Sequence, residues 1–189
     1  MKWASFLLMV ALAFIIFSCF GRHQALDSKP PLTVIMDSLN YRPSQLVLLV
    51  DKSERHLYAI ADSDTLKTYK IVLGGNPNDD KMKEGDGCTP EGNFLIQDLY
   101  PHQKWSKFMW INYPTAESWQ RFNTRKKNGL IAQSDKIGGE IGIHGVPENG
   151  DWLIDTGKNW TLGCISLKNK DIDDLYAACS VGTKVIIRK

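Results

Sequence analysis

The sequence carries little net charge, which limits the partners it can have. Its 23 lysines and arginines against 21 aspartates and glutamates leave a formal net charge of +2. No basic cluster stands out beyond the triplet 125–127, and such a triplet is typical of a solvated loop. The charge pattern therefore gives no argument for a nucleic-acid partner.

Repeats, low-complexity tracts and β–α alternation are also missing, which excludes solenoids and doubly wound folds. A late helix is predicted over 170–178, with Asn169 as its N-cap, and a shorter helix over 118–123. Many short strands beside one clear late helix predict a mainly β (α+β) domain. Short apolar or alternating runs predict strands at 45–51, 56–61, 68–73, 93–99, 107–113, 141–143 and 184–188.

The one long apolar run lies at the N-terminus. Lys2 precedes a near-continuous apolar stretch over 6–17, and a small residue then stands directly before Cys19. This pattern is typical of a bacterial lipoprotein, so we expect residues 1–18 to be a signal peptide and Cys19 to carry lipid that tethers the protein to a membrane. The alternative is an uncleaved anchor helix over 3–20. Either interpretation predicts export to the periplasm or cell envelope.

The remaining chain divides into a tether and one domain. Residues 19–43 are polar, rich in proline and without sustained periodicity, so they are predicted to be a tether. Residues 44–189 are long enough for one domain with its own core. In an oxidising compartment Cys88 and Cys179 are free to pair, but they fit equally well as small buried residues, and both alternatives stay open.

Cys164 and His144 are the candidate catalytic residues. Gly163 directly precedes Cys164 and permits an unusual backbone angle and close approach by a substrate. His144 lies twenty residues upstream, at the end of a predicted strand, and is followed by Gly145. A thiol, an imidazole and a glycine-lined turn are the parts of a cysteine acyl-transfer site.

The chemistry requires the two side chains to act together. A free thiol with a pKa near 8.5 is only roughly 3% thiolate at pH 7. An imidazolium beside Cys164 is expected to lower the thiol pKa to ~6.5, a shift of about 2.7 kcal/mol. His144 would then return the proton to a leaving amine, oriented by a backbone carbonyl. Backbone N–H groups around Gly163 and Cys164 are expected to hold the developing oxyanion.

Four segments in order carry a family resemblance. His144-Gly145 followed, 17 positions on, by Thr161-x-Gly-Cys-Ile resembles the signature of the YkuD-type L,D-transpeptidases. The segment 84–92 resembles the family's Thr-Pro-x-Gly turn with its acidic lead, and 110–114 resembles its strand ending in Tyr-Pro. The resemblance covers about 46–187.

The resemblance implies a fold and a mechanism. The fold would be an L,D-transpeptidase-like β-sandwich or barrel of short strands with one late helix packed on it. Cys164 would attack a peptidoglycan tetrapeptide stem at meso-diaminopimelate, D-alanine would leave, and an amine would resolve the thioester. His144 would be the base, oriented by the carbonyl of Gly145, and no metal or cofactor is implied. The residues expected on the oxyanion and substrate side are Gly163, Thr161, Ser166 and Trp160.

Two departures from the family pattern leave the reaction open. Leu162 stands where the family usually has a second histidine, and Ser166 where many members have arginine or asparagine. The variant resembles a YafK-like subgroup of murein transpeptidases and hydrolases, in which water can resolve the thioester. We therefore keep three hypotheses: an L,D-transpeptidase active in cell-wall biogenesis and cell shape, a peptidoglycan amide hydrolase, and a non-catalytic wall-binding lipoprotein.

Other side chains receive plainer interpretations. His102 follows a Tyr-Pro pair and lacks metal-ligand spacing, so it is expected to be structural or on the surface. Asp86 is expected to shape its turn through side-chain hydrogen bonds. Among the tryptophans, Trp152 and Trp160 flank Cys164 in sequence and are the best candidates for a cleft wall.

Overall fold

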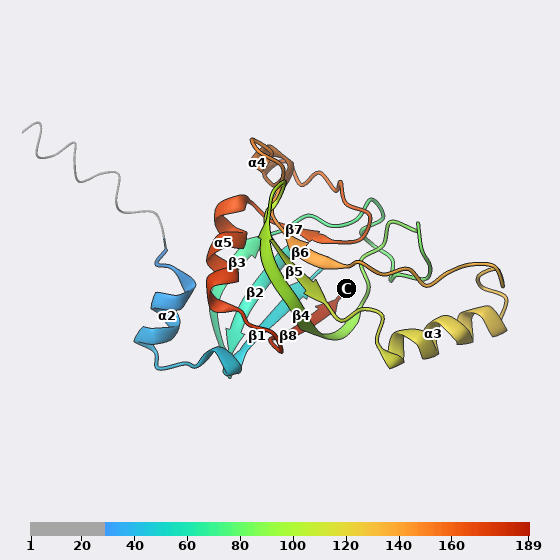
Figure 1. Cartoon of the computed structure of the whole chain (residues 1–189), viewed down its shortest axis with the longest axis horizontal. Coiled ribbons are helices and arrows are strands. Elements are labelled where there is room, and N and C mark those ends of the chain that lie inside the picture. The colour runs from blue at the N-terminus through green and yellow to red at the C-terminus, as the bar shows by residue number, and fades with distance from the viewer. Residues whose placement is uncertain (1–28) are drawn as a thin grey trace, which may run out of the picture. The chain divides into compact units, whose positions relative to one another are not determined.

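One eight-stranded sheet frames the protein in the computed structural model, which describes residues 29–189 (Figure 1). The strand order is β3-β2-β1-β8-β4-β5-β6-β7. β1 and β8 are parallel, as are β6 and β7, and the other neighbours are antiparallel. The strands are β1 (Leu46–Asp51), β2 (His56–Ala61), β3 (Asp64–Lys70), β4 (Gly92–His102), β5 (Ser106–Ile111), β6 (Gly142–His144), β7 (Ile165–Ser166) and β8 (Lys184–Arg188).

Helices are few and short, so the prediction of a mainly β domain is confirmed. They are α2 (Leu32–Ser38), the 3-10 turn η1 (Pro43–Gln45), α3 (Ala116–Lys127), α4 (Asp151–Asp155) and α5 (Asn169–Ala178). Within residues 29–189, none of them has the length and apolar character needed to cross a membrane.

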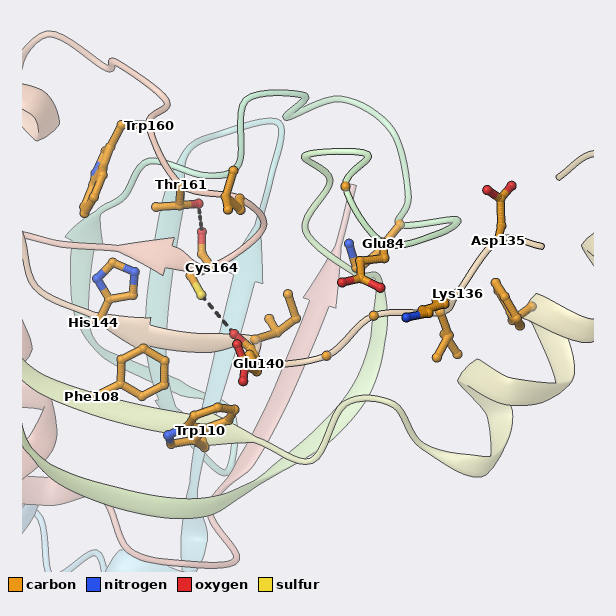
Figure 2. A pocket seen from close by; sticks show the side chains of 18 of the residues that line it. Glu84, Phe108, Trp110, Asp135, Lys136, Glu140, His144, Trp160, Thr161 and Cys164 are labelled. Carbon is orange, nitrogen blue, oxygen red and sulfur yellow. Dashed lines mark hydrogen bonds between the residues drawn. The ribbon is translucent and has the colours of Figure 1, made fainter. Parts of the chain in front are cut away.

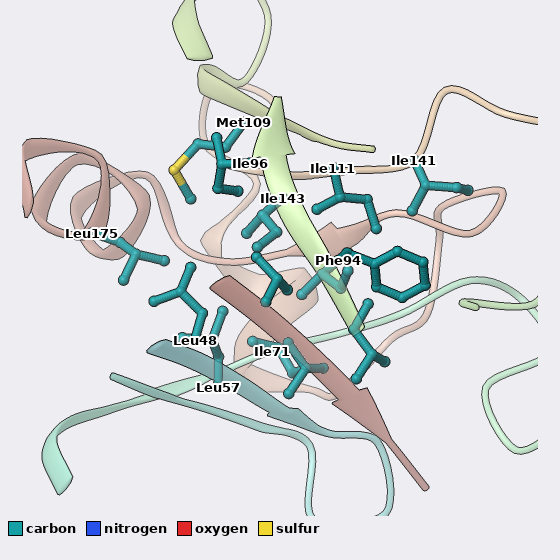
Figure 3. Close-up of a cluster of buried hydrophobic side chains, with 14 of the residues drawn as sticks. Leu48, Leu57, Ile71, Phe94, Ile96, Met109, Ile111, Ile141, Ile143 and Leu175 are labelled. Atoms are coloured by element: carbon teal, nitrogen blue, oxygen red, sulfur yellow. The ribbon is translucent and has the colours of Figure 1, made fainter. Parts of the chain in front are cut away.

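The core lies between the sheet and α5. Leu48, Leu57 and Ile143 are fully buried, and Leu175 reaches the same cluster from α5 (Figure 3). In β2 the buried and half-buried side chains alternate, as the sequence pattern predicted. β6 and β7 are buried along their whole length. Packing around these two strands therefore fixes the positions of the residues at their ends.

The late helix α5 starts differently from the expectation. Ile172 and Leu175 are buried on its apolar face as predicted, but Asn169 is the first helical residue and Lys168 holds the N-cap position. The Asn169 side-chain oxygen instead accepts a hydrogen bond from the Val146 N–H at 3.0 Å. The N-cap prediction was wrong because the side chain is used to fix the chain leaving β6.

The helix α3 is twice as long as the predicted segment 118–123. Its N-cap is Thr115, whose hydroxyl accepts from the Ser118 N–H. Only two of its residues, Ser118 and Phe122, are buried, and Trp119 is exposed. An apolar pattern this sparse carries little signal beyond the central turns.

The helix α2 corrects the prediction of a tether over 19–43. Leu32 and Met36 are 0% and 3% exposed and belong to the main core cluster. The Leu32 N–H also donates to Asp174 of α5 at 2.8 Å. The folded unit therefore begins at Leu32, ahead of the predicted boundary at residue 44. Two buried side chains in a seven-residue helix are too few to give a visible periodicity.

The cysteine and leader predictions have different outcomes. Cys88, Cys164 and Cys179 are all free thiols, so the pair left open between Cys88 and Cys179 is not formed in this structure. The signal peptide at 1–18 and the lipidation site at Cys19 lie outside the described residues.

The role of α2 can be tested by a matched pair of truncations on the same helix. Met36→Ala removes a core side chain and is expected to cost about 2–5 kcal/mol of unfolding free energy. Val34→Ala, at a side chain that is 51% exposed, should change it by less than about 0.5 kcal/mol. Urea denaturation measures both changes in unfolding free energy. Equal changes would mean that α2 does not belong to the folded unit and that residues 32–42 are a tether.

Candidate active site

Adjacent parallel strands bring the two candidate catalytic residues together. His144 is the last residue of β6, and Cys164 directly precedes β7. The two strands pair with Ile143 opposite Ile165 and His144 opposite Ser166. A separation of twenty residues in sequence thus becomes one strand spacing, and both side chains face the same cavity (Figure 2).

His144 is buried in an aromatic cage. Its imidazole stacks on Trp105 at a centroid distance of 4.4 Å and on Phe108 at 5.5 Å. Trp160 contacts it edge-on at 5.5 Å. Neither Trp105 nor Phe108 was expected at the site, because an aromatic residue in an ordinary strand pattern carries no signal of a catalytic neighbour.

One hydrogen bond sets the tautomer of His144. Nδ1 lies 2.7 Å from the carbonyl oxygen of Gly145. A carbonyl oxygen only accepts, so Nδ1 carries the proton and Nε2 presents a lone pair. Burial lowers the pKa of His144 to about 4, although the Gly145 carbonyl acts in the opposite direction. The ring is therefore a neutral base near pH 7.

The Cys164 thiol is also neutral at rest. It is half-buried, and its Sγ donates to the carbonyl oxygen of Glu140 at 3.4 Å. Burial raises the pKa of the Cys164 thiol to about 11. The expected thiolate–imidazolium pair with a thiol pKa of ~6.5 is therefore not favoured at rest, because burial raises the pKa of the thiol and lowers the pKa of the imidazole, and both shifts favour the neutral forms.

Ser166 and Gly145 hold His144 through a shared hydrogen-bond acceptor, the Gly145 oxygen. The Ser166 hydroxyl is fully buried and donates to the Gly145 oxygen at 3.2 Å. That oxygen thus accepts from both His144 and Ser166. Ser166 does not line the cavity, so its predicted place on the substrate side was wrong.

Thr161 and Gly163 shape the turn that presents the thiol. The Thr161 hydroxyl donates to the Cys164 oxygen at 2.7 Å and accepts from the Gly163 N–H at 3.2 Å. The Gly163 N–H is therefore already bonded to Thr161. The expectation that it holds the oxyanion is not met. Gly163 has φ +142°, and a Cβ there would lie 2.7 Å from the Cys88 oxygen, so both conformation and space require glycine.

A second close approach packs the segment after β3 against the same turn. A Cβ on Gly74 would lie 2.0 Å from the Gly87 oxygen and 3.0 Å from the Gly163 nitrogen. Gly75 donates to the Thr161 oxygen at 3.1 Å. Three segments distant in sequence therefore meet directly through their backbones beside Cys164.

Asp86 holds the middle one of these segments. Its carboxylate accepts from the N–H groups of Met82, Lys83 and Cys88 and pairs with Lys81 at 2.9 Å. The structure thus agrees with the turn-shaping interpretation of this aspartate.

The site is a cavity of about 1320 Å³ with two unlike walls. His144 lies among the aromatic side chains, and Cys164 lies between these and the charged groups (Figure 2). One wall is aromatic, and Leu162, which is 86% exposed, lies at the edge. The aromatic wall comprises Tyr100, His102, Trp105, Phe108, Trp110 and Trp160, and the charged wall comprises Lys81, Glu84, Lys126, Asp135, Lys136 and Glu140.

Two of the plainer sequence interpretations need correction. His102 lines the cavity and stacks on Trp105 at 4.4 Å, so it belongs to the site. Trp152 does not line the cavity and is 51% exposed, whereas Trp160 does line it. Proximity to Cys164 in sequence could not tell which of the two tryptophans lines the cavity, because Trp152 belongs to α4 and lies outside it.

The fold is the one found in a solved L,D-transpeptidase. The chain belongs to the YkuD family, the L,D-transpeptidase catalytic domain, whose family model matches residues 45–187.

Individual relatives agree with this assignment. The chain is 25% identical over 152 residues to "Putative L,D-transpeptidase YqjB" of Bacillus subtilis (strain 168), covering 78% of this chain and 74% of that protein. It resembles the helical cell shape determining protein Pgp2 of Campylobacter jejuni, with TM-score 0.53, 20% identity and coverage of 84% and 55%. An L,D-transpeptidase of Mycobacterium smegmatis gives TM-score 0.50, 14% identity and coverage of 77% and 59%. The chain therefore spans little more than half the length of these solved chains.

Two neighbouring glycines test the backbone contact at the site. Gly74→Ala should collide with Gly87, destabilise the fold by about 2 kcal/mol or more and displace the turn that carries Cys164. Gly75→Ala meets nothing within 4 Å, so its unfolding free energy should stay within about 0.5 kcal/mol of the wild type. Urea denaturation together with the rate of Cys164 alkylation measures both effects, and a harmless Gly74→Ala would refute the close approach.

The resting protonation state can be tested by thiol alkylation. Because the Cys164 pKa is raised to about 11, the iodoacetamide rate at this residue should rise about tenfold per pH unit from pH 7 to 9. Peptide mass spectrometry assigns the label to Cys164. His144→Gln should leave this slope unchanged. A rate that is already on a plateau near pH 7, and loses the plateau in His144→Gln, would instead demonstrate an ion pair.

Proposed function

We propose that this protein is a peptidoglycan-modifying cysteine acyltransferase of the L,D-transpeptidase type, with Cys164 as nucleophile and His144 as general base. The observation that carries the proposal is the 2.7 Å contact between His144 Nδ1 and the Gly145 oxygen. It leaves Nε2 as the free acceptor in the cavity that also contains the Cys164 thiol. Family membership over residues 45–187 supports the same reaction class.

The first half of the reaction forms a thioester. Sγ of Cys164 attacks the carbonyl carbon of the donor stem while Nε2 of His144 takes the thiol proton. The imidazolium then gives this proton to the leaving amine of D-alanine. Because both groups are neutral at rest, the thiol must pass its proton to Nε2 for the sulfur to become nucleophilic.

The second half releases the stem. An acceptor amine attacks the thioester, the new C–N bond forms and the C–S bond breaks. His144 takes a proton from the amine and returns it to the sulfur, which restores the neutral pair. No metal or cofactor takes part in these steps.

The volume and the lining of the cavity suit a peptide substrate. About 1320 Å³ exceeds what a single amino acid requires. The aromatic wall offers flat apolar surface, while the charged wall offers groups for the ammonium and carboxylate ends of a branched stem.

The leader pattern at 1–18 and Cys19 extends the proposal to location. Peptidoglycan stems lie outside the cytoplasm, so a protein acting on them must be exported. We propose a lipoprotein held at a membrane of the cell envelope through Cys19.

The test is intact-protein mass spectrometry with a disaccharide-tetrapeptide donor. The wild type should gain the mass of the donor less D-alanine, and Cys164→Ala should gain nothing. Cys179→Ala is the matched control, because this half-buried thiol follows α5 and does not line the cavity, and it should form the adduct normally.

The released products distinguish the alternatives. New amide-linked stems would establish the transpeptidase, whereas an adduct followed only by trimmed stems would assign the hydrolase. The absence of any adduct would favour the wall-binding lipoprotein and reject Cys164 as nucleophile.

A further inference from the structure

The charged wall of the cavity contains side chains that the fold itself does not neutralise. Lys81 pairs with Asp86 at 2.9 Å, and Lys83 pairs with Asp135 at 3.0 Å. Within residues 29–189, in contrast, the carboxylate of Glu140 has neither an ion pair nor a hydrogen bond, and it lines the cavity as an exposed group. An unpaired carboxylate in a substrate cavity is free to bind a cation.

Glu140 lies beside the sulfur. Its main-chain oxygen accepts a hydrogen bond from the Cys164 S–H at 3.4 Å. Its side chain lines the same cavity as Cys164 (Figure 2). Its negative charge is also among the influences that raise the pKa of the Cys164 thiol, after burial.

The backbone of Glu140 is in a conformation that glycine adopts more easily. Its φ is +57°, in the left-handed region that costs about 1–2 kcal/mol for a residue with a side chain. The two preceding residues are Gly138 and Gly139, so the segment is already rich in the residue that would relieve this cost. Strained residues of this kind cluster at ligand sites.

We propose that Glu140 is the specificity-determining residue for the second half of the reaction, binding the ammonium group of a primary-amine acceptor next to the thioester. This inference rests on the proposed function. When the thioester forms, the S–H is lost and the Glu140 carbonyl loses its donor. The acceptor ammonium then finds two oxygen acceptors on one residue, the carbonyl and the carboxylate, beside the carbon that its nitrogen attacks after losing a proton.

The protons balance in this arrangement. The bound ammonium must lose two protons to become an amide nitrogen. The first leaves to solvent through the Glu140 carboxylate before the attack, which frees the nitrogen lone pair. The second passes to Nε2 of His144 and on to the departing sulfur as the C–N bond replaces the C–S bond. Water carries no charge for Glu140 to bind, so the residue favours amine transfer over hydrolysis.

The experiment measures how each adduct is resolved. The full chain in detergent is given the disaccharide-tetrapeptide donor with D-methionine as acceptor, and the ratio of D-methionine-linked to hydrolysed stem is read by mass spectrometry. The ratio counts only adducts already formed, so it does not depend on the rate of acylation. Glu140→Gln should lower the ratio at least about tenfold, because a charged hydrogen bond is lost.

Two further variants make the test specific. Glu140→Gly should lower the ratio equally without lowering the melting temperature, since glycine accepts the left-handed backbone. Glu148→Gln removes an exposed carboxylate that likewise has no ion pair or hydrogen bond within residues 29–189 but does not line the cavity, so it should leave the ratio unchanged.

Failure of the inference and failure of the proposed function give different results. If the wild type forms no adduct, the proposed function is lost. If the wild type forms the adduct and Glu140→Gln leaves the ratio unchanged, only the inference is overturned. An equal fall in Glu148→Gln would also overturn it, because the effect would then be one of overall charge.

Discussion

The site depends on a close contact of three backbone segments at Gly74, Gly87 and Gly163. No side chain fits between them, since a Cβ on Gly74 would lie 2.0 Å from the Gly87 oxygen. The contact fixes the turn before β7, and the Thr161 hydroxyl then completes it by accepting from the Gly163 N–H and donating to the Cys164 oxygen. The orientation of the Cys164 thiol is therefore a consequence of main-chain packing, and the sheet only supplies the frame.

Burial determines the electrostatics of the reactive pair. The aromatic cage that orients His144 also removes water from it, and the same desolvation acts on Cys164. Two neutral groups result where the motif suggested two ions. Under the proposed mechanism, charge would separate only when a carbonyl carbon is bound, which would limit reactions of a free thiolate with oxidants.

The sequence predicted the frame better than the wall of the site. Alternating burial located β2, and the ordered motifs located His144 and Cys164, because both signals are local. The helix α2 depends on a distant partner, α5, that no local pattern encodes. His102 stacks on the nearby Trp105, but both rings belong to the site only because Trp105 contacts His144 and Trp160, which are distant in sequence. Glu140 was missed for the same reason: a carboxylate is informative only when its neighbours are known to leave it unpaired. A non-glycine residue following two glycines was the one available hint.

The Gly145 carbonyl oxygen accepts hydrogen bonds from both His144 and Ser166. The use of a main-chain group in this place has a genetic consequence. In many acid–base sites the group that orients the histidine is a side chain, and one codon change can delete it. Here it is a main-chain oxygen, which every amino acid possesses. Point mutation can therefore remove the side chain of the proposed nucleophile or the proposed base, but it can only displace the oxygen that orients the histidine. Such a site presents two essential side chains to mutation where a triad presents three.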